Sequence, residues 1–513
     1  MSDRSPAETS AEGRSKTTPG TPADEGQPDP RRWRVLGVSL VVGFMVLLDV
    51  TIVNVAVPSM NTGLDAAPGA IQWVVSGYAL AFGLTLVTGG RLGDAYGRRR
   101  LMVVGLLGFI ASSAAAGLAP DATWLVVARL VQGASAGLLT PQNSGLIQTL
   151  FRGRERGVAF GTFGLVVSVS SALGPVLGGA IIAIAGTDDG WRWIFLVNVP
   201  IGLALLLPIV RLVPGRDPAT RSERVRLDLL GAVLLGATVL AVLVPVVNLE
   251  GGTTTLLPLL VLVPVLAVGF VRWEHRVVRR GGAPLLDVGL LRRTPGYASG
   301  VTIGALYFTG FTGVFLVLSV FLQEGRGLTA LEAGLLLCPF AIGSAVAAPI
   351  AGRVVDRIGR ALTVGALLVM LLGLVVLALA VPAGGPLWLA LSVPLLLAGA
   401  GGGAVVSPNM TLSLADVPTR MGGAAGGALQ TGQRIGAAIG AAVTMTAYQV
   451  AVERLDDADI ALRWGIGTSV ALLAAAFVAA VWSWRREPAP GTRSADARET
   501  PETPETPETP TAP

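Results

Sequence analysis

Long apolar stretches alternate with short polar segments along almost the whole chain. A helix needs about 20 apolar residues to cross the roughly 30 Å of hydrocarbon in a bilayer, and fourteen stretches approach or exceed that length. They cover residues 35–57, 71–89, 101–119, 123–147, 158–185, 193–213, 229–249, 256–273, 297–321, 332–351, 361–381, 386–411, 425–449 and 463–484. The pattern predicts an all-α membrane protein with fourteen transmembrane helices.

Composition supports this membrane assignment. Of the 513 residues, 52% are hydrophobic and only 14% are charged, a balance that is not typical of a soluble domain of this size. No apolar core of a cleavable signal precedes residue 35, so we expect the first helix to remain in the protein. The one cysteine, Cys338, cannot form a disulfide within the chain, and its apolar neighbours favour a small core residue over a reactive thiol.

Arginine is concentrated in alternate loops. The loops at 58–70, 120–122, 250–255 and 382–385 contain none. The intervening loops hold Arg98, Arg99, Arg100, Arg152, Arg154, Arg156, Arg211, Arg216, Arg221, Arg224, Arg226, Arg279, Arg280, Arg292, Arg293, Arg357 and Arg360. Because these residues form no single basic face, the formal net charge of +5 does not indicate a nucleic-acid partner. The positive-inside rule places the arginine-bearing loops and both termini in the cytoplasm.

A charged nine-residue motif occurs twice, each time directly after a long apolar stretch. The second copy begins 262 positions after the first. The matching positions are Gly90, Arg91, Asp94, Gly97 and Arg98 in the first charged motif and Gly352, Arg353, Asp356, Gly359 and Arg360 in the second charged motif. Pro141 and Pro408 lie 267 positions apart, and Arg156 and Arg420 lie 264 apart. These similar offsets indicate an internal duplication, as in two-fold pseudosymmetric transporters.

The duplication predicts how the chain is divided. Residues 35–213 and 297–484 would form two pseudosymmetric six-helix bundles. Residues 214–296 would form a linker with two inserted transmembrane helices. The polar tails, residues 1–34 and 485–513, cannot bury a core and are expected to be disordered in the cytoplasm. We expect the chain to function as a monomer.

Each charged motif can form a latch at the cytoplasmic face. Its glycines allow a tight turn and a close helix approach. Asp94 and Arg98 are four positions apart, as are Asp356 and Arg360, so each pair can meet if the helix continues. Alternatively, the aspartate caps the next helix, which would start at Arg98. A plain positive loop is the simpler interpretation, but two copies with a matching aspartate favour a latch that holds one conformation of a rocking transporter.

Asp49 lies inside the first apolar stretch. An ionisable side chain at such depth is costly and indicates a functional site, and removal from water favours proton uptake by a carboxylate. At 1.5 Å per residue, Arg129 lies roughly 9 Å and Asp49 roughly 12 Å from the outer helix ends, so the two can form a switchable ion pair. Gln132 lies on the same helix face as Arg129. The simpler alternatives are a structural aspartate and an arginine that reaches the outer interface.

Other residues inside apolar stretches are candidates for the transport path. Gly174, Pro175, Gly178 and Gly179 would form a kinked hinge in the fifth stretch, although small residues also serve ordinary helix packing. The candidate polar groups of a central cavity are Asn54, Gln132, Asn143, Asn409, Gln430 and Arg434.

The sequence indicates neither an enzyme nor an ATP-driven pump. It contains no HExxH motif, and we find no paired carboxylates within the apolar stretches. Lys16 is the only lysine, so the lysine of a phosphate-binding loop is missing. We therefore expect no cofactor and no metal site. A chain with arginine in place of lysine also indicates a GC-rich bacterial genome and hence a multi-pass protein of the bacterial cytoplasmic membrane.

Several motifs in order resemble the major facilitator superfamily, and within it the fourteen-helix drug/proton antiporters. The charged motifs resemble the superfamily's loop signature, with Val355 marking a looser match in the second copy. The segment 48–58 resembles the helix 1 motif of the fourteen-helix branch, and 129–133 is similar to the helix 4 motif associated with proton coupling. The segment 174–179 is similar to the helix 5 motif of exporters. Trp191 to Phe195 and Asn198-x-Pro200 resemble the usual start of helix 6.

This resemblance covers about residues 35–484 and implies a function. The expected activity is proton-driven export of small amphipathic molecules, such as drugs or antibiotics, by alternating access across the bilayer. Asp49 and Arg129 would couple transport to protons. Two alternatives remain open: a proton-coupled importer of a specific nutrient, which would not need Gly174 and Pro175, and a non-transporting receptor, which would not depend on Asp49.

Overall fold

The computed structural model describes residues 29–64, 68–186, 189–215, 228–250, 255–282, 284–381, 386–455 and 457–486. The helices of the first half are α1 (Arg32–Gly63), α2 (Pro68–Tyr96), α3 (Arg98–Gly117), α4 (Ala122–Leu150), α5 (Gly153–Ala185), α6 (Gly190–Leu196) and α7 (Asn198–Leu212). Between the halves lie α8 (Leu229–Glu250), η2 (Leu257–Val261), α9 (Leu262–Arg279) and α10 (Gly289–Arg293). The second half contains α11 (Pro295–Val320), η3 (Phe321–Gly325), α12 (Ala330–Ile358), α13 (Arg360–Ala380), α14 (Leu387–Ser413), η5 (Thr419–Met421), α15 (Gly422–Leu455) and α16 (Ala458–Arg485).

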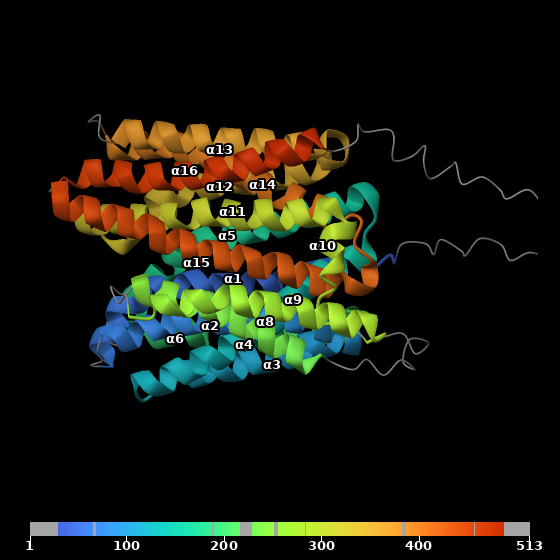
Figure 1. The fold of residues 1–513 in the computed structure, drawn as a ribbon. Coiled ribbons are helices and arrows are strands. Elements are labelled where there is room, and N and C mark those ends of the chain that lie inside the picture. The colour runs from blue at the N-terminus through green and yellow to red at the C-terminus, as the bar shows by residue number, and fades with distance from the viewer. Residues whose placement is uncertain are drawn as a thin grey trace, which may run out of the picture.

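The helix number agrees with the apolar pattern. Fourteen helical segments among the described residues are long and apolar enough to cross a membrane. They lie side by side in Figure 1, and all regular structure within the described ranges is helical. The sixth span consists of α6 and α7, and the eighth consists of η2 and α9. The predicted all-α membrane fold with fourteen helices is confirmed.

The helices extend further than the apolar stretches. α2 continues to Tyr96 and α12 continues to Ile358. Most of each charged motif is therefore helical, whereas its position after an apolar stretch had suggested a turn. Positive φ angles of 98° at Gly97 and 63° at Gly359 then end these helices, a conformation that glycine adopts without steric cost. α1 begins at Arg32, within the predicted tail 1–34, while residues 1–28 and 487–513 lie outside the described residues.

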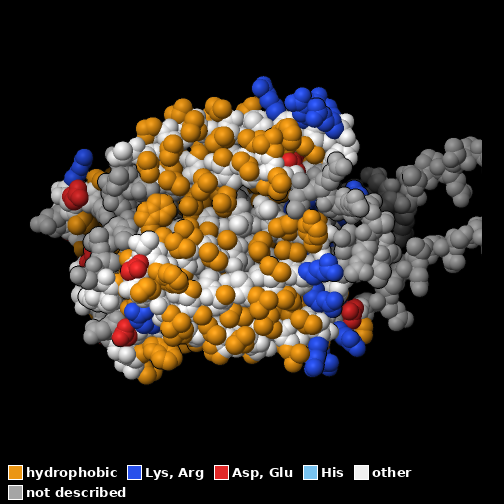
Figure 2. Space-filling view, turned by 90° about the horizontal axis from the view of Figure 1, so that it is seen from below, with side chains coloured by type: hydrophobic (Ala, Val, Ile, Leu, Met, Phe, Trp, Pro, Cys, Tyr) orange, Lys and Arg blue, Asp and Glu red, His pale blue; other side chains and the backbone are white. Residues whose placement is uncertain are grey.

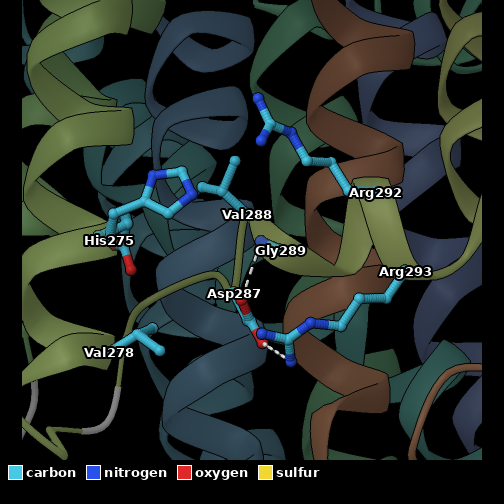
Figure 3. Close-up of a pocket in the computed structure, with 8 residues that line it drawn as sticks. His275, Val278, Asp287, Val288, Gly289, Arg292 and Arg293 are labelled. Carbon is cyan, nitrogen blue, oxygen red and sulfur yellow. Dashed lines mark hydrogen bonds and ion pairs between the residues drawn. The ribbon is translucent and has the colours of Figure 1, made fainter.

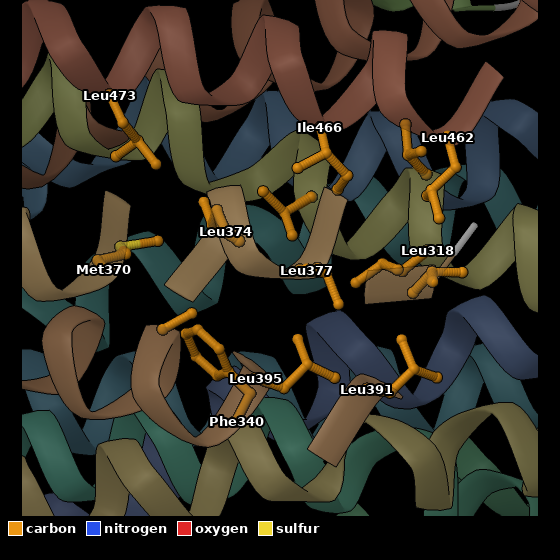
Figure 4. Packing of buried hydrophobic residues seen from close by; sticks show 14 of the residues in the cluster. Leu318, Phe340, Met370, Leu374, Leu377, Leu391, Leu395, Leu462, Ile466 and Leu473 are labelled. Carbon is orange, nitrogen blue, oxygen red and sulfur yellow. The ribbon is translucent and has the colours of Figure 1, made fainter. Parts of the chain in front are cut away.

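A continuous apolar cluster packs the second half. Figure 4 shows Leu374 and Leu377 of α13 between Ile466 of α16 and Leu395 of α14, and all four side chains are fully buried. Since lipid is as apolar as leucine, close packing and not the hydrophobic effect holds such helices together. The interlocked side chains make this half a rigid support for residues on its other surfaces.

The inserted helices cover the contact between the two halves. α8 packs against α2 of the first half and α15 of the second. Val242 and Val246 of α8 share a buried apolar cluster with Ala442 of α15, and Phe270 of α9 packs with Val87 of α2. In Figure 1, α8 and α9 accordingly lie in front of this region. The insert therefore contacts both halves.

Basic side chains gather at one end of the helix bundle, as Figure 2 shows. This is the end where α2, α4 and α12 finish and α3, α5 and α13 begin, and we call it the arginine-rich end. At the opposite end, Arg192 pairs with Asp189 at 2.8 Å and Arg326 pairs with Asp459 at 2.5 Å. Acidic partners thus offset arginine charge at the opposite end.

Candidate functional site

A buried ion pair connects α1 and α4. Nη1 of Arg129 donates to Oδ2 of Asp49 over 2.6 Å, and the two side chains are 1% and 0% exposed. Oδ1 of Asp49 accepts hydrogen bonds from Gln132 Nε2 and Asn198 Nδ2, each over 2.9 Å. Both carboxyl oxygens thus act as acceptors, as in an ionised carboxylate. Because α1 extends to Gly63, this pair lies near the middle of α1.

Arg129 has partners on all sides. Its Nε donates to the Val74 carbonyl oxygen over 3.1 Å, and its Nη1 donates to Gln132 Oε1 over 2.7 Å. Its guanidinium carbon lies 4.0 Å from the centre of the Tyr78 ring and 5.4 Å from that of Phe195, both within the range of a cation–π interaction. The alternative of an arginine that reaches the outer interface is therefore wrong, and the expected ion pair is present.

Sequence reasoning missed three members of this cluster. Asn198 belongs to the motif at the start of the sixth helix, but that motif did not predict a contact with Asp49. No sequence pattern singled out Tyr78 or Ser113. Ser113 accepts from Gln132 Nε2 over 2.7 Å, and Tyr78 donates to the Val46 carbonyl oxygen over 3.3 Å. An asparagine within an apolar run, as at Asn198, was the one signal that could have indicated a buried partner.

The first charged motif reaches across to the second half. Asp94 pairs with Arg98 Nη2 over 3.0 Å, which confirms the expected pair four positions apart. Asp94 also accepts from the backbone amides of Gly423 and Ala424, over 3.2 and 2.9 Å. These amides belong to the first turn of α15, where donors lack helical partners and an anion is favoured. The alternative in which Asp94 caps the helix at Arg98 is wrong: Gly97 precedes α3, without a side-chain cap, and Asp94 caps α15.

The second charged motif has different partners. Nη2 of Arg360 donates to the carbonyl oxygen of Gly296 over 2.6 Å. Asp356 interacts electrostatically with Arg156 and Arg154 at the start of α5. The aspartate of each motif thus faces the opposite half of the chain.

Two backbone contacts close the arginine-rich end in a pseudosymmetric manner. A Cβ atom at Gly90 would overlap the Gly423 carbonyl oxygen and lie 2.9 Å from the Ala424 nitrogen. A Cβ atom at Gly352 would overlap the Gly157 carbonyl oxygen and lie 2.9 Å from Cα of Gly161. α2 therefore approaches α15, and α12 approaches α5, as closely as glycine allows. Arg91 and Arg353 follow these glycines directly.

The glycines of the helix 5 motif pack against the helix that carries Asp49. A Cβ atom at Gly174 would lie 2.6 Å from Cβ of Thr51, and one at Gly178 would lie 2.9 Å from the Ile52 carbonyl oxygen. Gly179 instead faces Leu331 of α12. α5 continues through this region, and the side chain of Pro175 is not among those described. The geometry shows close packing of α5 on α1, and the hinge remains a prediction.

The other candidate polar groups lie at several places between helices. Gln430 donates to Ser144 over 3.1 Å, and Arg434 lies 4.5 Å above the Phe82 ring, so both join α15 to the first half. Asn409 donates to the Gly300 carbonyl oxygen over 2.9 Å within the second half. Asn143 is buried beside Gly43 of α1. The side chain of Asn54 lies outside the described part of the structure.

Comparison with known proteins agrees with this arrangement. Residues 39–441 match the Major Facilitator Superfamily. The chain is 36% identical over 438 residues to a probable actinorhodin transporter of Streptomyces coelicolor, covering 84% of this chain and 75% of that protein. It is 37% identical over 425 residues to the puromycin resistance protein pur8 of Streptomyces alboniger, covering 82% of each.

A solved structure shows the same fold. The proton:xylose symporter XylE superposes with a TM-score of 0.65 at 16% identity, over 90% of this chain and 97% of XylE. The family match covers most of the chain, and the family and the relatives named above indicate a transporter. The chain therefore belongs to the Major Facilitator Superfamily.

Proposed function

We propose that this protein is a proton-coupled antiporter that exports amphipathic drugs or antibiotics across the bacterial cytoplasmic membrane. The arginine-rich end and both termini would face the cytoplasm. A single chain would be the functional unit. It would consist of two six-helix bundles and an inserted helix pair, with the boundaries that the duplication predicts. The observation that carries the proposal is the buried pair of Asp49 and Arg129. A charge pair inside a membrane is costly and marks a coupling site.

The pair offers a simple route from proton binding to conformational change. A proton on Oδ2 of Asp49 would remove the charge that holds Arg129 at 2.6 Å. Arg129 would then be an uncompensated buried charge, which costs about 3–5 kcal/mol. That cost falls if α4 and α1 move apart or water enters. Proton binding at Asp49 therefore favours a different arrangement of these helices.

Alternating access would use the contacts at the arginine-rich end. In this conformation α2 meets α15 and α12 meets α5 there, with Asp94 bound to the first turn of α15. With the positive end in the cytoplasm, the structure would correspond to a state closed to the cytoplasm. Opening must separate both glycine contacts, so Asp94 would act as the latch and Gly174 and Gly178 would allow α5 to shift against α1.

An aromatic surface in the second half is a candidate contact for the substrate. Tyr307 and Phe311 of α11 stack with ring centres 5.3 Å apart, and Phe340 of α12 lies 5.5 Å from Phe311. Phe308 and Phe315 extend the cluster and, like Phe311, are only half-buried. Aromatic rings stack on planar apolar ligands. Similar proteins are named for actinorhodin transport and puromycin resistance, which supports an antibiotic as substrate.

The test measures proton release from acid-loaded, inside-out membrane vesicles that contain the protein. A pH-sensitive dye in the lumen reports proton loss when cationic dyes, puromycin or planar aromatic polyketides are added. Wild type is compared with Asp49→Asn and with Asp189→Asn, which removes a carboxylate that is 74% exposed. We expect substrate-dependent proton release in wild type and Asp189→Asn and its loss in Asp49→Asn.

Two results would reject the proposal. If Asp49→Asn releases protons like wild type, Asp49 is structural and coupling occurs elsewhere. If compounds leave the vesicle lumen together with protons, the direction is that of an importer. Radiolabelled substrate measured in the same vesicles separates these outcomes, because an exporter accumulates substrate in an inside-out lumen.

A further inference from the structure

Glu274 is a buried carboxyl group in the inserted helices. It lies on α9, within two turns of the arginine-rich end, and is 1% exposed. Both of its carboxyl oxygens are buried without a hydrogen-bond partner. The backbone amides of Leu285 and Leu286 lie near the carboxyl group and partly favour its charged form, although neither makes a hydrogen bond within normal distance and angle limits. An ionised carboxylate in such a place is strongly disfavoured, whereas its protonated form is tolerated.

A second carboxylate makes a charge on Glu274 still less favourable. Asp228, just before α8, accepts from the Trp273 indole over 2.8 Å and from the Gly231 amide over 2.8 Å. Asp228 therefore has two hydrogen-bond donors, whereas Glu274 has none. A Cβ atom at Gly231 would lie 2.6 Å from Asp228 Oδ2 and 2.7 Å from Glu274 Oε1, so the two carboxyl groups approach each other across this glycine. Two neighbouring carboxyl groups favour a single negative charge.

A counter-charge for Glu274 comes from the first charged motif. Arg91 of α2 interacts electrostatically with Glu274, and α8 packs on α2 beside it. The other titratable or charged groups near Glu274 come from α9 itself, from the segment before α10 and from α10. They are His275, Asp287, Arg292 and Arg293. The described part of α15 contributes apolar Ala428 to this region.

A cavity lies beside Glu274. It has a volume of about 220 Å³, and Glu274 forms part of its wall. Figure 3 shows His275 on one side of the cavity and Asp287, Arg292 and Arg293 on the other. Arg293 is held by Asp287 at 3.7 Å. The cavity has room for several waters, and a movement that exposed the Glu274 carboxyl group to it would give its proton a path to water.

We propose that Glu274 is a second proton-binding residue of the transport cycle, linking the inserted helices to the latch. It holds a proton while the arginine-rich end is closed and releases it to water when that end opens, with Arg91 as counter-charge. The idea rests on the alternating access proposed above. The closed conformation then binds one more proton at this site than the open one, so raising the pH favours opening.

The test measures the distance across the latch as a function of pH. Spin labels are placed at Tyr96→Cys on α2 and Arg420→Cys before α15, both exposed, in a Cys338→Ala background within lipid nanodiscs. Glu274→Gln imitates the protonated form, and Glu274→Asp keeps a carboxyl group. Glu453→Gln, which removes an exposed carboxylate at the far end of α15, is the matched control.

We expect the open population of wild type, Glu453→Gln and Glu274→Asp to increase more with pH than that of Glu274→Gln, because any effect of proton binding at Asp49 is the same in all four proteins. In Glu274→Gln, the ratio of open to closed molecules should increase less steeply with pH, by about a factor of ten per pH unit, because one proton no longer takes part. The infrared band of a protonated carboxyl group should also be absent from Glu274→Gln at neutral pH. A wild-type pH response in Glu274→Gln would overturn the idea. Equal loss in Glu274→Asp would show a structural effect and overturn it as well.

The antiport assay separates this inference from the proposed function. Suppose that vesicles show antiport that depends on Asp49, but Glu274→Gln keeps the wild-type pH response of the latch. Then antiport stands and the role of Glu274 fails. If no compound moves protons while the latch still responds to pH through Glu274, the antiport proposal fails and the proton site at Glu274 remains supported.

Discussion

A methyl group at either pseudosymmetric glycine contact should open the arginine-rich end. At Gly90 a Cβ atom would overlap the Gly423 carbonyl oxygen, and at Gly352 it would overlap that of Gly157. Both obstacles are backbone atoms, which cannot rotate away as a flexible side chain can. The helices must therefore separate, and we expect Gly90→Ala and Gly352→Ala to destabilise the closed conformation while leaving each half folded.

The size of the effect follows from the packing. Forcing an extra carbon into a tightly packed contact costs about 1–3 kcal/mol. A cost of that size lowers the ratio of closed to open molecules about 5–150-fold. Alanine also stabilises a helix by up to about 1 kcal/mol relative to glycine, but that gain applies to both conformations and cancels in their ratio.

The assay is the distance between spin labels at positions 96 and 420 at fixed pH. Gly365→Ala on α13 is the matched control, because a Cβ atom there meets nothing within 4 Å. Gly90→Ala and Gly352→Ala should shift the distribution toward the open distance, and Gly365→Ala should not. If Gly90→Ala keeps the closed population of Gly365→Ala, the glycine contact does not hold this end closed and the reasoning is refuted.

Four further substitutions test the polar cluster and the aromatic surface. Removal of either partner of the ion pair, in Asp49→Asn or Arg129→Gln, should cost about 3–5 kcal/mol in thermal unfolding. The double variant should cost less than their sum, and additive losses would contradict a coupled pair. Asn198→Ala removes a donor to a charged group and should lower the unfolding free energy by about 1.5–3 kcal/mol; an unchanged melting temperature would contradict this. Phe311→Ala should weaken transport of planar aromatic compounds about 2–13-fold, given about 0.5–1.5 kcal/mol for an aromatic pair beyond its buried area, while leaving a non-aromatic cation unaffected in the same vesicle assay.

Local sequence patterns were sufficient for the helix number and for the ion pair. The length of an apolar run sets whether a helix can span a bilayer, and this length can be read without knowledge of the neighbouring helices. Asp49 and Arg129 stood out because charges are rare within such runs, and counting residues from the helix ends placed them at similar depth. Their 2.6 Å contact followed from depth and from the need of each charge for a partner.

The same local reasoning found only part of the contacts made by charges at helix ends: the pair of Asp94 with Arg98 is confirmed, whereas the cap at Arg98 is wrong. Asp94 was expected to pair with Arg98 or to cap the helix beginning there, because both partners are close in sequence. Its contact with the first turn of α15 joins residues more than 300 positions apart, and no local pattern contains it. The sequence does not single out Glu274 for a related reason. It lies among arginines near a helix end, where exposure is the normal expectation. It also follows the predicted apolar stretch 256–273, so a search for paired carboxylates within the stretches does not include it.

The sequence by itself determined the fourteen-helix architecture, the internal duplication and the positions of the intramembrane charges. Tertiary structure alone decided that Asn198 completes the Asp49 cluster, that Asp94 holds α15, and that the inserted helices contact both halves. The physical reason is the range of the forces involved. Hydrophobic length and charge depth are properties of one segment in its solvent, whereas hydrogen-bond partners and burial depend on which helices pack together.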